Sequence, residues 1–291
     1  MGESGKFFLT ASTCGFCRGV REALAHFEKA LEKYHPPVYV LHELVHNKFV
    51  TSSMSSAGAV FVSSLDEVPA GSVLLIGAHG VSAAVMQECQ KRFTVIDATC
   101  PRVLALQKMA GKIPEQSELV MLCKPGHPEA EGVIGHSSTE KIYAVSSLED
   151  VKKLPALTSP VLLAQTTVSG ELVSQVKSYL TDKYPAISSV SRRCDASDRR
   201  QQAVKELAKK CDFIIVVGSK HSSNACELHK LAMASGVRSC MVDSAEDIGL
   251  AMFEDVSSVG ITAGASTPDE LISGVKVRLQ EIGYADAGAA E

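Results

Sequence analysis

Apolar and polar positions follow one pattern three times along the chain. A short strand that ends in a turn is predicted at residues 59–68, 142–151 and 239–248. A second apolar strand, ending in small or polar residues, follows each of them at 73–81, 161–168 and 258–266. Repetition at a near-constant period predicts three related structural modules.

Another apolar strand precedes each of these pairs and runs into polar residues, at 37–47, 118–129 and 212–224. Phe213–Val217 in the third module is continuously apolar. Continuous apolar runs bounded by glycine, alternating with helical segments, are typical of parallel strands that helices cover on both faces. We therefore predict an α/β protein with three pseudo-symmetric modules and mostly parallel sheets.

An amphipathic helix begins next to a cysteine at the start of each repeat, at Cys17, Cys100 and Cys194. Apolar residues at spacings of three and four predict these helices, and Pro101 suits a first helical position. The predicted modules cover residues 12–100, 101–192 and 193–284. Residues 1–11 are expected to add a strand to the third module, and the Ala-rich tail, 285–291, is expected to fray.

Composition and net charge disfavour some classes of function. The 291 residues carry 33 acidic side chains against 29 Lys and Arg, for a formal net charge of −4. Because no basic run is present, nucleic acid is disfavoured as a partner. No stretch resembles a signal peptide or approaches eighteen apolar residues, so we expect a cytoplasmic protein without a membrane partner.

The nine cysteines are an odd number in a chain expected to stay in the cytosol, which disfavours a disulfide framework. Cys17, Cys100 and Cys194 recur in phase with the modules, so pseudo-symmetric packing would bring them to one axis. A helix N-terminus stabilises a thiolate, the form that binds metal. A catalytic zinc and an iron–sulfur cluster with one non-cysteine iron both fit three thiolates and an open position.

We interpret the remaining cysteines as packing residues, because none has a partner at ligand spacing. Cys14 and Cys17 form a C-x-x-C pair, but the surrounding segments lack the strand–turn–helix context of a thioredoxin-like redox motif.

Polar side chains gather at the predicted strand ends in all three modules. Ligands of parallel α/β sheets bind beyond the carboxyl ends of the strands, and imidazoles, hydroxyls and amides suit a phosphate or diphosphate. A carboxyl in the Gly-flanked turn at Glu129 can transfer protons if it is partly desolvated. The candidates are His46, His79, His127, Glu129, Thr166, Thr167, Ser222, Ser223, Asn224 and Ser266.

Eight short motifs, in this order, resemble the LytB-type 4-hydroxy-3-methylbut-2-enyl diphosphate reductases. The resemblance spans nearly the whole chain. The motifs are GFCRGV at 15–20, VHN at 45–47, AHGV at 78–81, DATCP at 97–101, GHPE at 126–129, QTT at 165–167, GSK with SSN at 218–224, and TAGAS at 262–266.

The resemblance implies a trefoil of three α/β domains around a [4Fe–4S] cluster held by Cys17, Cys100 and Cys194, with the fourth iron open. It implies reductive dehydration of an allylic diphosphate to isopentenyl and dimethylallyl diphosphates, the last step of the non-mevalonate pathway. Reduced ferredoxin or flavodoxin is the implied electron donor.

Residue roles carried over from the family divide the polar residues at the predicted strand ends into two groups. Thr166, His127 and Glu129 would surround the substrate hydroxyl, with Glu129 delivering protons. The diphosphate would be bound by His46, His79, Ser222, Ser223, Asn224 and Ser266. The segment 195–201 departs from the family pattern, and its residues are left unassigned.

Two other functions fit the residues without the resemblance. One is a zinc-dependent hydrolase that uses the same thiolates with His127 and Glu129. The other is a non-catalytic diphosphate-binding protein whose cysteines only pack.

Overall fold

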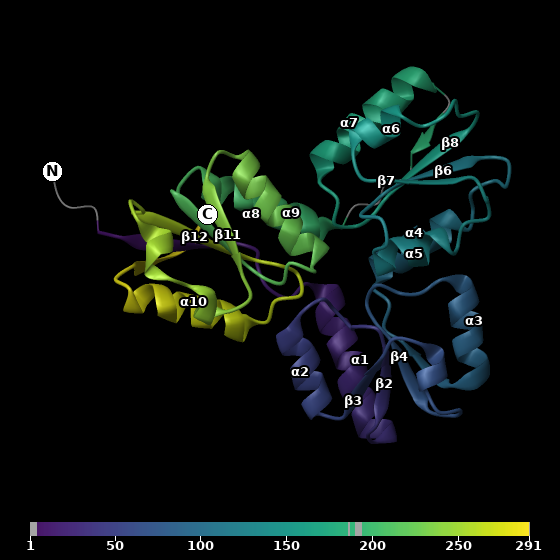
Figure 1. Ribbon diagram of the computed structural model, residues 1–291, viewed down its shortest axis with the longest axis horizontal. Coiled ribbons are helices and arrows are strands. Elements are labelled where there is room, and N and C mark those ends of the chain that lie inside the picture. Colours follow the sequence, from purple (N-terminus) through teal and green to yellow (C-terminus); the bar gives the residue numbers. More distant parts are fainter. Residues whose placement is uncertain (1–4, 186, 190–193, 291) are drawn as a thin grey trace. The chain divides into compact units, whose positions relative to one another are not determined.

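The computed structural model describes residues 5–185, 187–189 and 194–290 (Figure 1). The chain forms two compact units. One comprises Met1–Arg18, His46–Val50 and Asp195–Glu291, and the other comprises Gly19–Val45 and Thr51–Cys194. Every strand pairing within the described residues is parallel, which confirms the predicted α/β class.

The first unit is built on a five-stranded sheet of order β11-β10-β12-β1-β13. Its strands are β1 (Phe7–Ala11), β10 (Phe213–Val217), β11 (Arg238–Val242), β12 (Ser258–Ala263) and β13 (Ala285–Ala290). Its helices are α8 (Asp195–Ala208), α9 (Ser223–Ala234) and α10 (Asp269–Glu281), with short 3-10 turns η2 (Ala245–Asp247) and η3 (Leu250–Phe253).

Helices cover both faces of this sheet. Successive side chains of a strand point to opposite faces, so neighbouring residues of one strand pack in two different cores. Ile215 packs in the core that contains Val275 of α10. Its neighbour Val216 packs instead in the core that contains Val204 of α8 and Leu228 of α9. β10 is therefore apolar at every position, as predicted for a strand buried on both sides.

The second unit contains two four-stranded sheets, of order β3-β2-β4-β5 and β7-β6-β8-β9. The strands are β2 (Val38–Leu41), β3 (Ala59–Val62), β4 (Val73–Ile76), β5 (Thr94–Asp97), β6 (Glu118–Leu122), β7 (Ile142–Val145), β8 (Pro160–Ala164) and β9 (Ser188–Ser189). Helices α1 (Arg18–Tyr34), α2 (Lys48–Ser56) and α3 (Ala83–Arg92), with η1 (Leu65–Glu67), accompany the first sheet. Helices α4 (Pro101–Ala110), α5 (Pro128–Ile134), α6 (Leu148–Lys152) and α7 (Gly170–Lys183) accompany the second.

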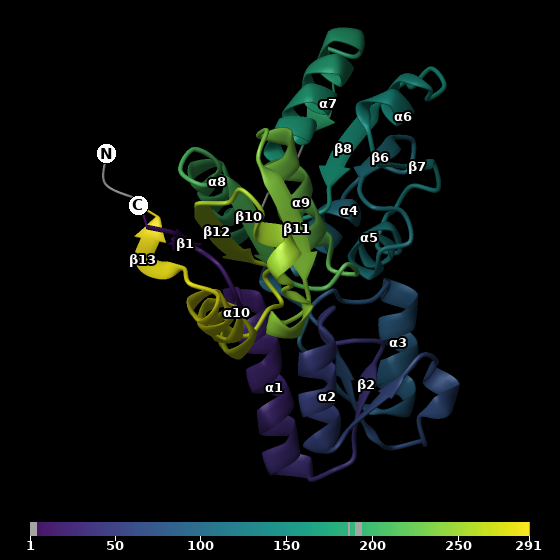
Figure 2. The same cartoon turned by 60° about the vertical axis from the view of Figure 1, so that its left-hand side comes forward.

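Both of these sheets are also covered on two faces. Figure 2 shows α1 and α2 on one side of β2 and α3 on the other. In the other sheet, Met121 packs in the core that contains Leu106 of α4. Leu122 packs in the core that contains Val176 of α7.

The three sheets share one strand order, which confirms the predicted threefold repetition. In each sheet the first strand of the module lies between the second and third, and a fourth strand lies beyond the third. The fourth strands are β5, β9 and β1, and each one precedes one of Cys100, Cys194 and Cys17 in the chain. The module limits 12–100, 101–192 and 193–284 stay predictions.

The expectation that the C-terminal tail frays is wrong for residues 285–290. They form β13, which pairs with β1 along the open edge of the first unit's sheet. The buried Tyr284 ring fixes the start of this strand, because its hydroxyl donates to the Val256 carbonyl at 2.7 Å. Ala285 N–H then donates to the Lys6 carbonyl at 2.9 Å, so backbone pairing compensates for the weak strand propensity of the tail.

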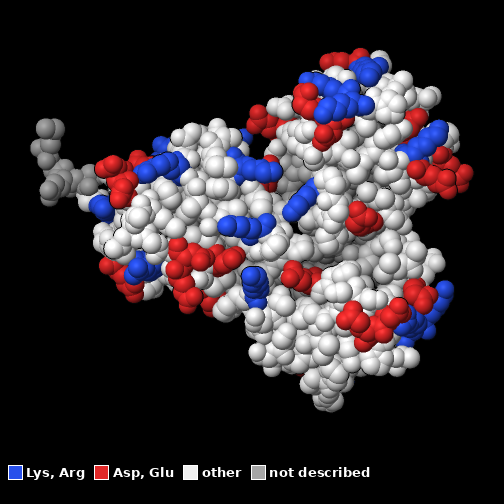
Figure 3. Space-filling model, in the orientation of Figure 1, with Lys and Arg blue, Asp and Glu red and all other residues white. Residues whose placement is uncertain are grey.

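Acidic and basic side chains are interspersed on the face drawn in Figure 3. Exposed ion pairs such as Lys152–Glu149, 2.7 Å apart, contribute little to stability because water screens them. Within the described part of the chain, no helix combines the length and the apolar character that a membrane span requires.

Candidate active site

The predicted site residues follow the strand ends at recurring offsets. His46, His127 and Ser222 each lie five residues after the end of the first strand of their module, β2, β6 or β10. His79, Thr167 and Ser266 each lie three residues after β4, β8 or β12. In parallel sheets these offsets place polar side chains beyond the carboxyl edge, where ligands bind.

The buried carboxyl of Glu129 is bound by Thr166 within the second unit. Glu129 is the second residue of α5 and is 2% exposed. The backbone N–H of Thr166 donates to its Oε1 at 2.7 Å, and the Thr166 hydroxyl donates to its Oε2 at 2.8 Å. Burial raises the pKa of Glu129, and the two hydrogen bonds offset that rise only in part. The carboxyl is thereby suited to carry a proton.

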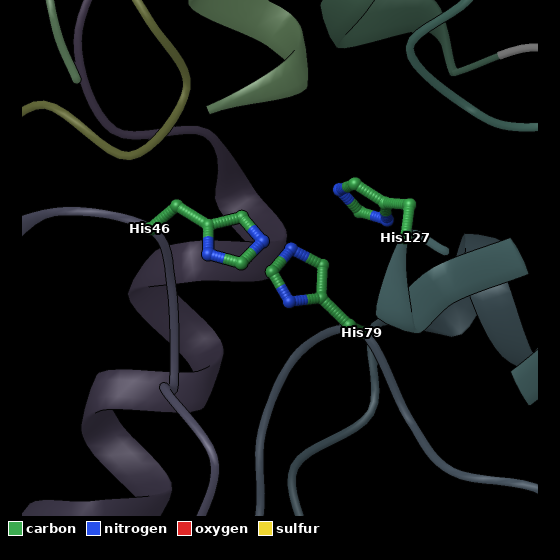
Figure 4. Close-up of side chains that lie close together, drawn as sticks. All are labelled: His46, His79 and His127. Carbon is green, nitrogen blue, oxygen red and sulfur yellow. The ribbon is translucent and has the colours of Figure 1, made fainter. Parts of the chain in front are cut away.

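His127 precedes α5 and is oriented by the helix backbone. Its Nδ1 accepts a hydrogen bond from the Glu129 N–H at 3.1 Å, so a neutral ring carries its proton on Nε2. The His79 ring lies edge-on to it, with centroids 5.1 Å apart and planes at 84° (Figure 4). Figure 4 also labels His46, which belongs to the first unit.

Cys100 caps α4 and is tied to the loop that carries His79. Its N–H donates to the Ala78 carbonyl at 3.0 Å, and Pro101 occupies the first helical position, as predicted. The N–H and hydroxyl of the preceding Thr99 both donate to Asp97, at 3.0 and 2.5 Å. The half-buried thiol is therefore fixed by a closed turn at the end of β5.

In the first unit, the structure brings together serines from two strand ends. Ser222 caps α9, and its Oγ lies 3.5 Å from the hydroxyl of Ser266. Ser266 also donates to the His46 carbonyl at 3.4 Å. Asn224 Oδ1 accepts from the Ala265 N–H at 2.8 Å. This group combines hydroxyls with the N-terminus of a twelve-residue helix, a combination that favours anions.

Two buried polar atoms of this group point to a ligand. Ser223 Oγ and Asn224 Nδ2 are buried and have no hydrogen-bond partner within the described residues. Buried donors are rarely left unpaired, so a bound group with acceptor oxygens would satisfy them. A diphosphate has such oxygens.

Cys17 and Cys194 also lie at helix starts. Cys17 directly precedes α1, and its N–H donates to the Ala265 carbonyl at 3.1 Å. Cys194 directly precedes α8. Both thiols are half-buried, like that of Cys100. The placement of the three thiols around one axis stays a prediction.

Cys89, Cys123 and Cys211 are buried packing residues, as predicted. Burial raises the pKa of Cys123 to about 12 and that of Cys211 to about 11, so both remain protonated thiols near neutral pH.

Sequence reasoning missed two buried side chains that support the site. Arg200, 3% exposed, lies in the unassigned segment and donates to the carbonyls of Gly15 and Ala196. It thereby ties α8 to the turn before Cys17. Gln107, 4% exposed, interrupts the apolar face of α4 and donates to the Val81 carbonyl at 3.3 Å. The only sequence signal was a polar residue at an apolar position of the predicted helix.

Comparison with known proteins finds relatives that this chain matches over most of their length and most of its own. The 4-hydroxy-3-methylbut-2-enyl diphosphate reductase of Haemophilus influenzae strain PittGG is 41% identical over 283 residues, covering 94% of this chain and 90% of that protein. The reductase of the same name from Neisseria gonorrhoeae strain NCCP11945 is 41% identical over 297 residues, covering 99% of this chain and 92% of that protein.

Solved structures agree with the sequence relatives. The E-1-hydroxy-2-methyl-but-2-enyl-4-diphosphate reductase of Plasmodium falciparum superposes with a TM-score of 0.93 at 29% identity, covering 98% of this chain and 92% of that one. A structure described as (E)-4-hydroxy-3-methyl-but-2-enyl diphosphate reductase, the terminal enzyme of the non-mevalonate pathway, gives 0.66 at 30% identity, covering 95% and 99%. The family model for LytB protein matches residues 8–280, and the chain therefore belongs to the LytB family.

Proposed function

We propose that this protein is a 4-hydroxy-3-methylbut-2-enyl diphosphate reductase. The reaction breaks the allylic C–O bond, consumes two electrons and two protons, and releases water with isopentenyl and dimethylallyl diphosphates. Family membership and the reductase names of its relatives support this proposal and favour it over a zinc-dependent hydrolase. The observation in the site that carries it is the buried Glu129 carboxyl, held by Thr166 and placed to move protons.

Cys17, Cys100 and Cys194 would hold a [4Fe–4S] cluster through their thiolates. Each is a half-buried thiol directly before a helix, and each follows the fourth strand of its sheet. Their donor chemistry fits an iron–sulfur cluster with one iron that lacks a protein ligand. Such a cluster, when bound, supplies the electrons and a Lewis-acidic site at that iron.

The diphosphate would be bound by groups that donate hydrogen bonds. Ser222, Ser223, Asn224 and Ser266 offer hydroxyls and an amide, and two of their buried atoms lack a partner within the described residues. His46 and His79 would add imidazole donors. These contacts would anchor the substrate and orient its hydroxyl end.

Glu129 would deliver the proton that converts the leaving hydroxyl into water. Its raised pKa keeps a larger share of the carboxyl protonated near neutral pH than an exposed glutamate would have. Thr166 holds both carboxylate oxygens. His127, whose Nδ1 accepts from the Glu129 N–H, would offer Nε2–H as a donor to the substrate. The three residues would therefore surround the substrate hydroxyl.

The electrons would come from a small reduced carrier, a ferredoxin or flavodoxin. We place the enzyme in the cytoplasm, a compartment that keeps thiols reduced, and no disulfide links the cysteines of the described residues.

Anaerobic turnover of synthetic (E)-4-hydroxy-3-methylbut-2-enyl diphosphate tests the function. The reconstituted protein, supplied with a chemical reductant, is expected to form isopentenyl and dimethylallyl diphosphates, identified by mass spectrometry after dephosphorylation. A preparation with a full iron complement that forms neither product would overturn the proposal.

A further inference from the structure

The buried amide of Gln107 lies where three site-bearing segments of the second unit meet. Gln107 is on α4, about two turns after Cys100. Its Nε2 donates to the Val81 carbonyl at 3.3 Å. Val81 belongs to the loop that carries His79, so one hydrogen bond connects this loop to the helix of Cys100.

Two glycines leave the space that the amide occupies. A Cβ at Gly80 would lie 2.6 Å from Gln107 Nε2, and a Cβ at Gly132 would lie 3.2 Å from it. Gly80 directly follows His79, and Gly132 is in α5, about one turn after Glu129. The amide is therefore packed between the His79 loop and the first turns of α5, where a Cβ at Gly80 would collide with it and a Cβ at Gly132 would be in tight contact with it.

The His79 loop and α5 also touch directly through glycines. A Cβ at Gly132 would lie 3.5 Å from the Val81 carbonyl, and a Cβ at Gly135 would lie 2.3 Å from Ser82 Cβ. The Ala83 N–H donates to the Gly135 carbonyl at 3.4 Å. How closely the loop and α5 approach each other therefore depends both on these direct contacts and on the Gln107 amide, which fills the space beside them.

That approach determines where two imidazoles of the site lie. His79 immediately precedes Gly80, and His127 immediately precedes α5. Their ring centroids are 5.1 Å apart. A displacement of the loop relative to α5 would change this separation, and reacting or binding groups displaced by about 1 Å lose much of their effect.

We propose that Gln107 is a positioning residue that sets the separation of His79 and His127 through the Val81 carbonyl. The inference rests on the proposed function, in which both imidazoles contact the substrate. It also accounts for an amide on a helix face whose neighbours Leu106 and Ala110 pack in an apolar core. A buried amide is costly unless its hydrogen bonds are made.

The first test compares Gln107→Leu with Lys108→Leu, an exposed neighbour on the same helix. Leucine fills a similar volume but cannot donate to Val81. In the anaerobic holoenzyme, Gln107→Leu is expected to raise KM about tenfold, to weaken binding of inorganic diphosphate in calorimetry by a similar factor, and to change kcat less than about threefold. Lys108→Leu is expected to change none of these, and both variants should keep the iron content of the parent.

A double-mutant cycle tests the packing directly. Gly132→Ala places a methyl group against the amide, so diphosphate binding should weaken. Gln107→Ala removes the amide and with it the collision. In the double variant the loss of affinity should be smaller than the product of the two single losses, and a loss equal to that product would overturn the packing argument.

Other outcomes overturn the proposal itself. If Gln107→Leu lowers the melting temperature but keeps the KM and the diphosphate affinity of the parent, the amide is only structural. Crystal structures of the parent and of Gln107→Leu measure the His79–His127 separation whether or not the chain is a reductase. An unchanged separation would overturn the inference, whereas absence of turnover in the parent would overturn only the proposed function.

Discussion

Thr166 donates both its backbone N–H and its hydroxyl to the carboxylate of Glu129, at 2.7 and 2.8 Å. The pair joins the end of β8 to the start of α5. Burial favours the protonated carboxyl, whereas the two donors favour the ionised form. The net effect is a raised pKa on a carboxyl whose two oxygens are held in place. A proton donor that works near neutral pH requires both properties.

Glu129→Gln separates proton delivery from binding. Glutamine keeps the shape, and its amide can accept from the Thr166 N–H and donate to the Thr166 hydroxyl. It has no acidic proton, so kcat is expected to fall about 100-fold or more. The affinity for isopentenyl diphosphate, measured by calorimetry, should stay within about threefold of the parent. Glu131→Gln, an exposed neighbour in α5, is the matched control and should behave as the parent. Equal losses of affinity and turnover in Glu129→Gln would contradict the role.

Thr166→Val removes one of the two donors to Glu129 while the backbone N–H remains. The hydroxyl lowers the pKa of this carboxyl, so its loss raises the pKa further. If protonated Glu129 is required, activity declines as pH rises through that pKa. The alkaline limb of the kcat profile is therefore expected to move to higher pH in the variant. A limb displaced to lower pH would show that another group sets it.

The raised pKa of Glu129 also predicts how stability depends on pH. Above the ordinary value of 4.5 the unfolded carboxyl ionises while the folded one stays protonated. The folded state then binds more protons, so this group lowers the free energy of unfolding until pH passes its folded pKa. The Glu129→Gln variant has no carboxyl at this position and therefore lacks this pH-dependent contribution to stability. Its advantage over the parent in urea unfolding should grow from pH 4.5 upward, and an advantage that shrinks with rising pH would contradict the shift.

Cysteine variants distinguish ligand candidates from packing residues. Cys100→Ala is expected to lose most of its iron, because one thiolate ligand is removed. Cys123→Ala is the matched control, since burial raises the pKa of that thiol to about 12 and it lies in an apolar core. This control should keep its iron and lose about 1 kcal/mol of unfolding free energy. Iron loss in Cys123→Ala alone would reverse the assignment.

Arg200→Gln tests the support of the turn before Cys17. The buried guanidinium donates to the Gly15 and Ala196 carbonyls, and hydrogen bonds from charged groups contribute about 1.5–3 kcal/mol each. The free energy of unfolding is expected to fall by about 2 kcal/mol or more. Arg199→Gln, at the exposed neighbouring position, should change it by less than about 0.5 kcal/mol. Equal effects of both substitutions would remove the special role of Arg200.

Local patterns predicted the parts of the fold that depend on burial. The continuously apolar run Phe213–Val217 is β10, buried on both faces, and Pro101 begins α4 directly after Cys100. The polar residues after β6 and β8 include Glu129 and Thr166, which the structure brings into contact. The strand, the helix start and the positions of the two polar residues follow from side-chain types at fixed spacings, so local sequence predicts them. The contact between Glu129 and Thr166 itself does not follow from a local pattern.

Features that arise from contacts between distant segments were not predictable in this way. β13 contains only Ala, Gly and Asp, and it becomes a strand because β1 offers it an open edge. β9 has two residues, too few for a periodic signal. The space that the Gln107 side chain fills depends on Gly80 and Gly132, which are far from it in the chain. No local pattern indicates that the three residues meet.

The content of iron and acid-labile sulfide in anaerobically reconstituted protein tests the central claim most directly. The account predicts about four iron and four sulfide per chain, with a loss of both when Cys17, Cys100 or Cys194 is replaced by alanine. Protein that binds a single zinc instead, or that keeps its full iron in all three variants, would contradict it.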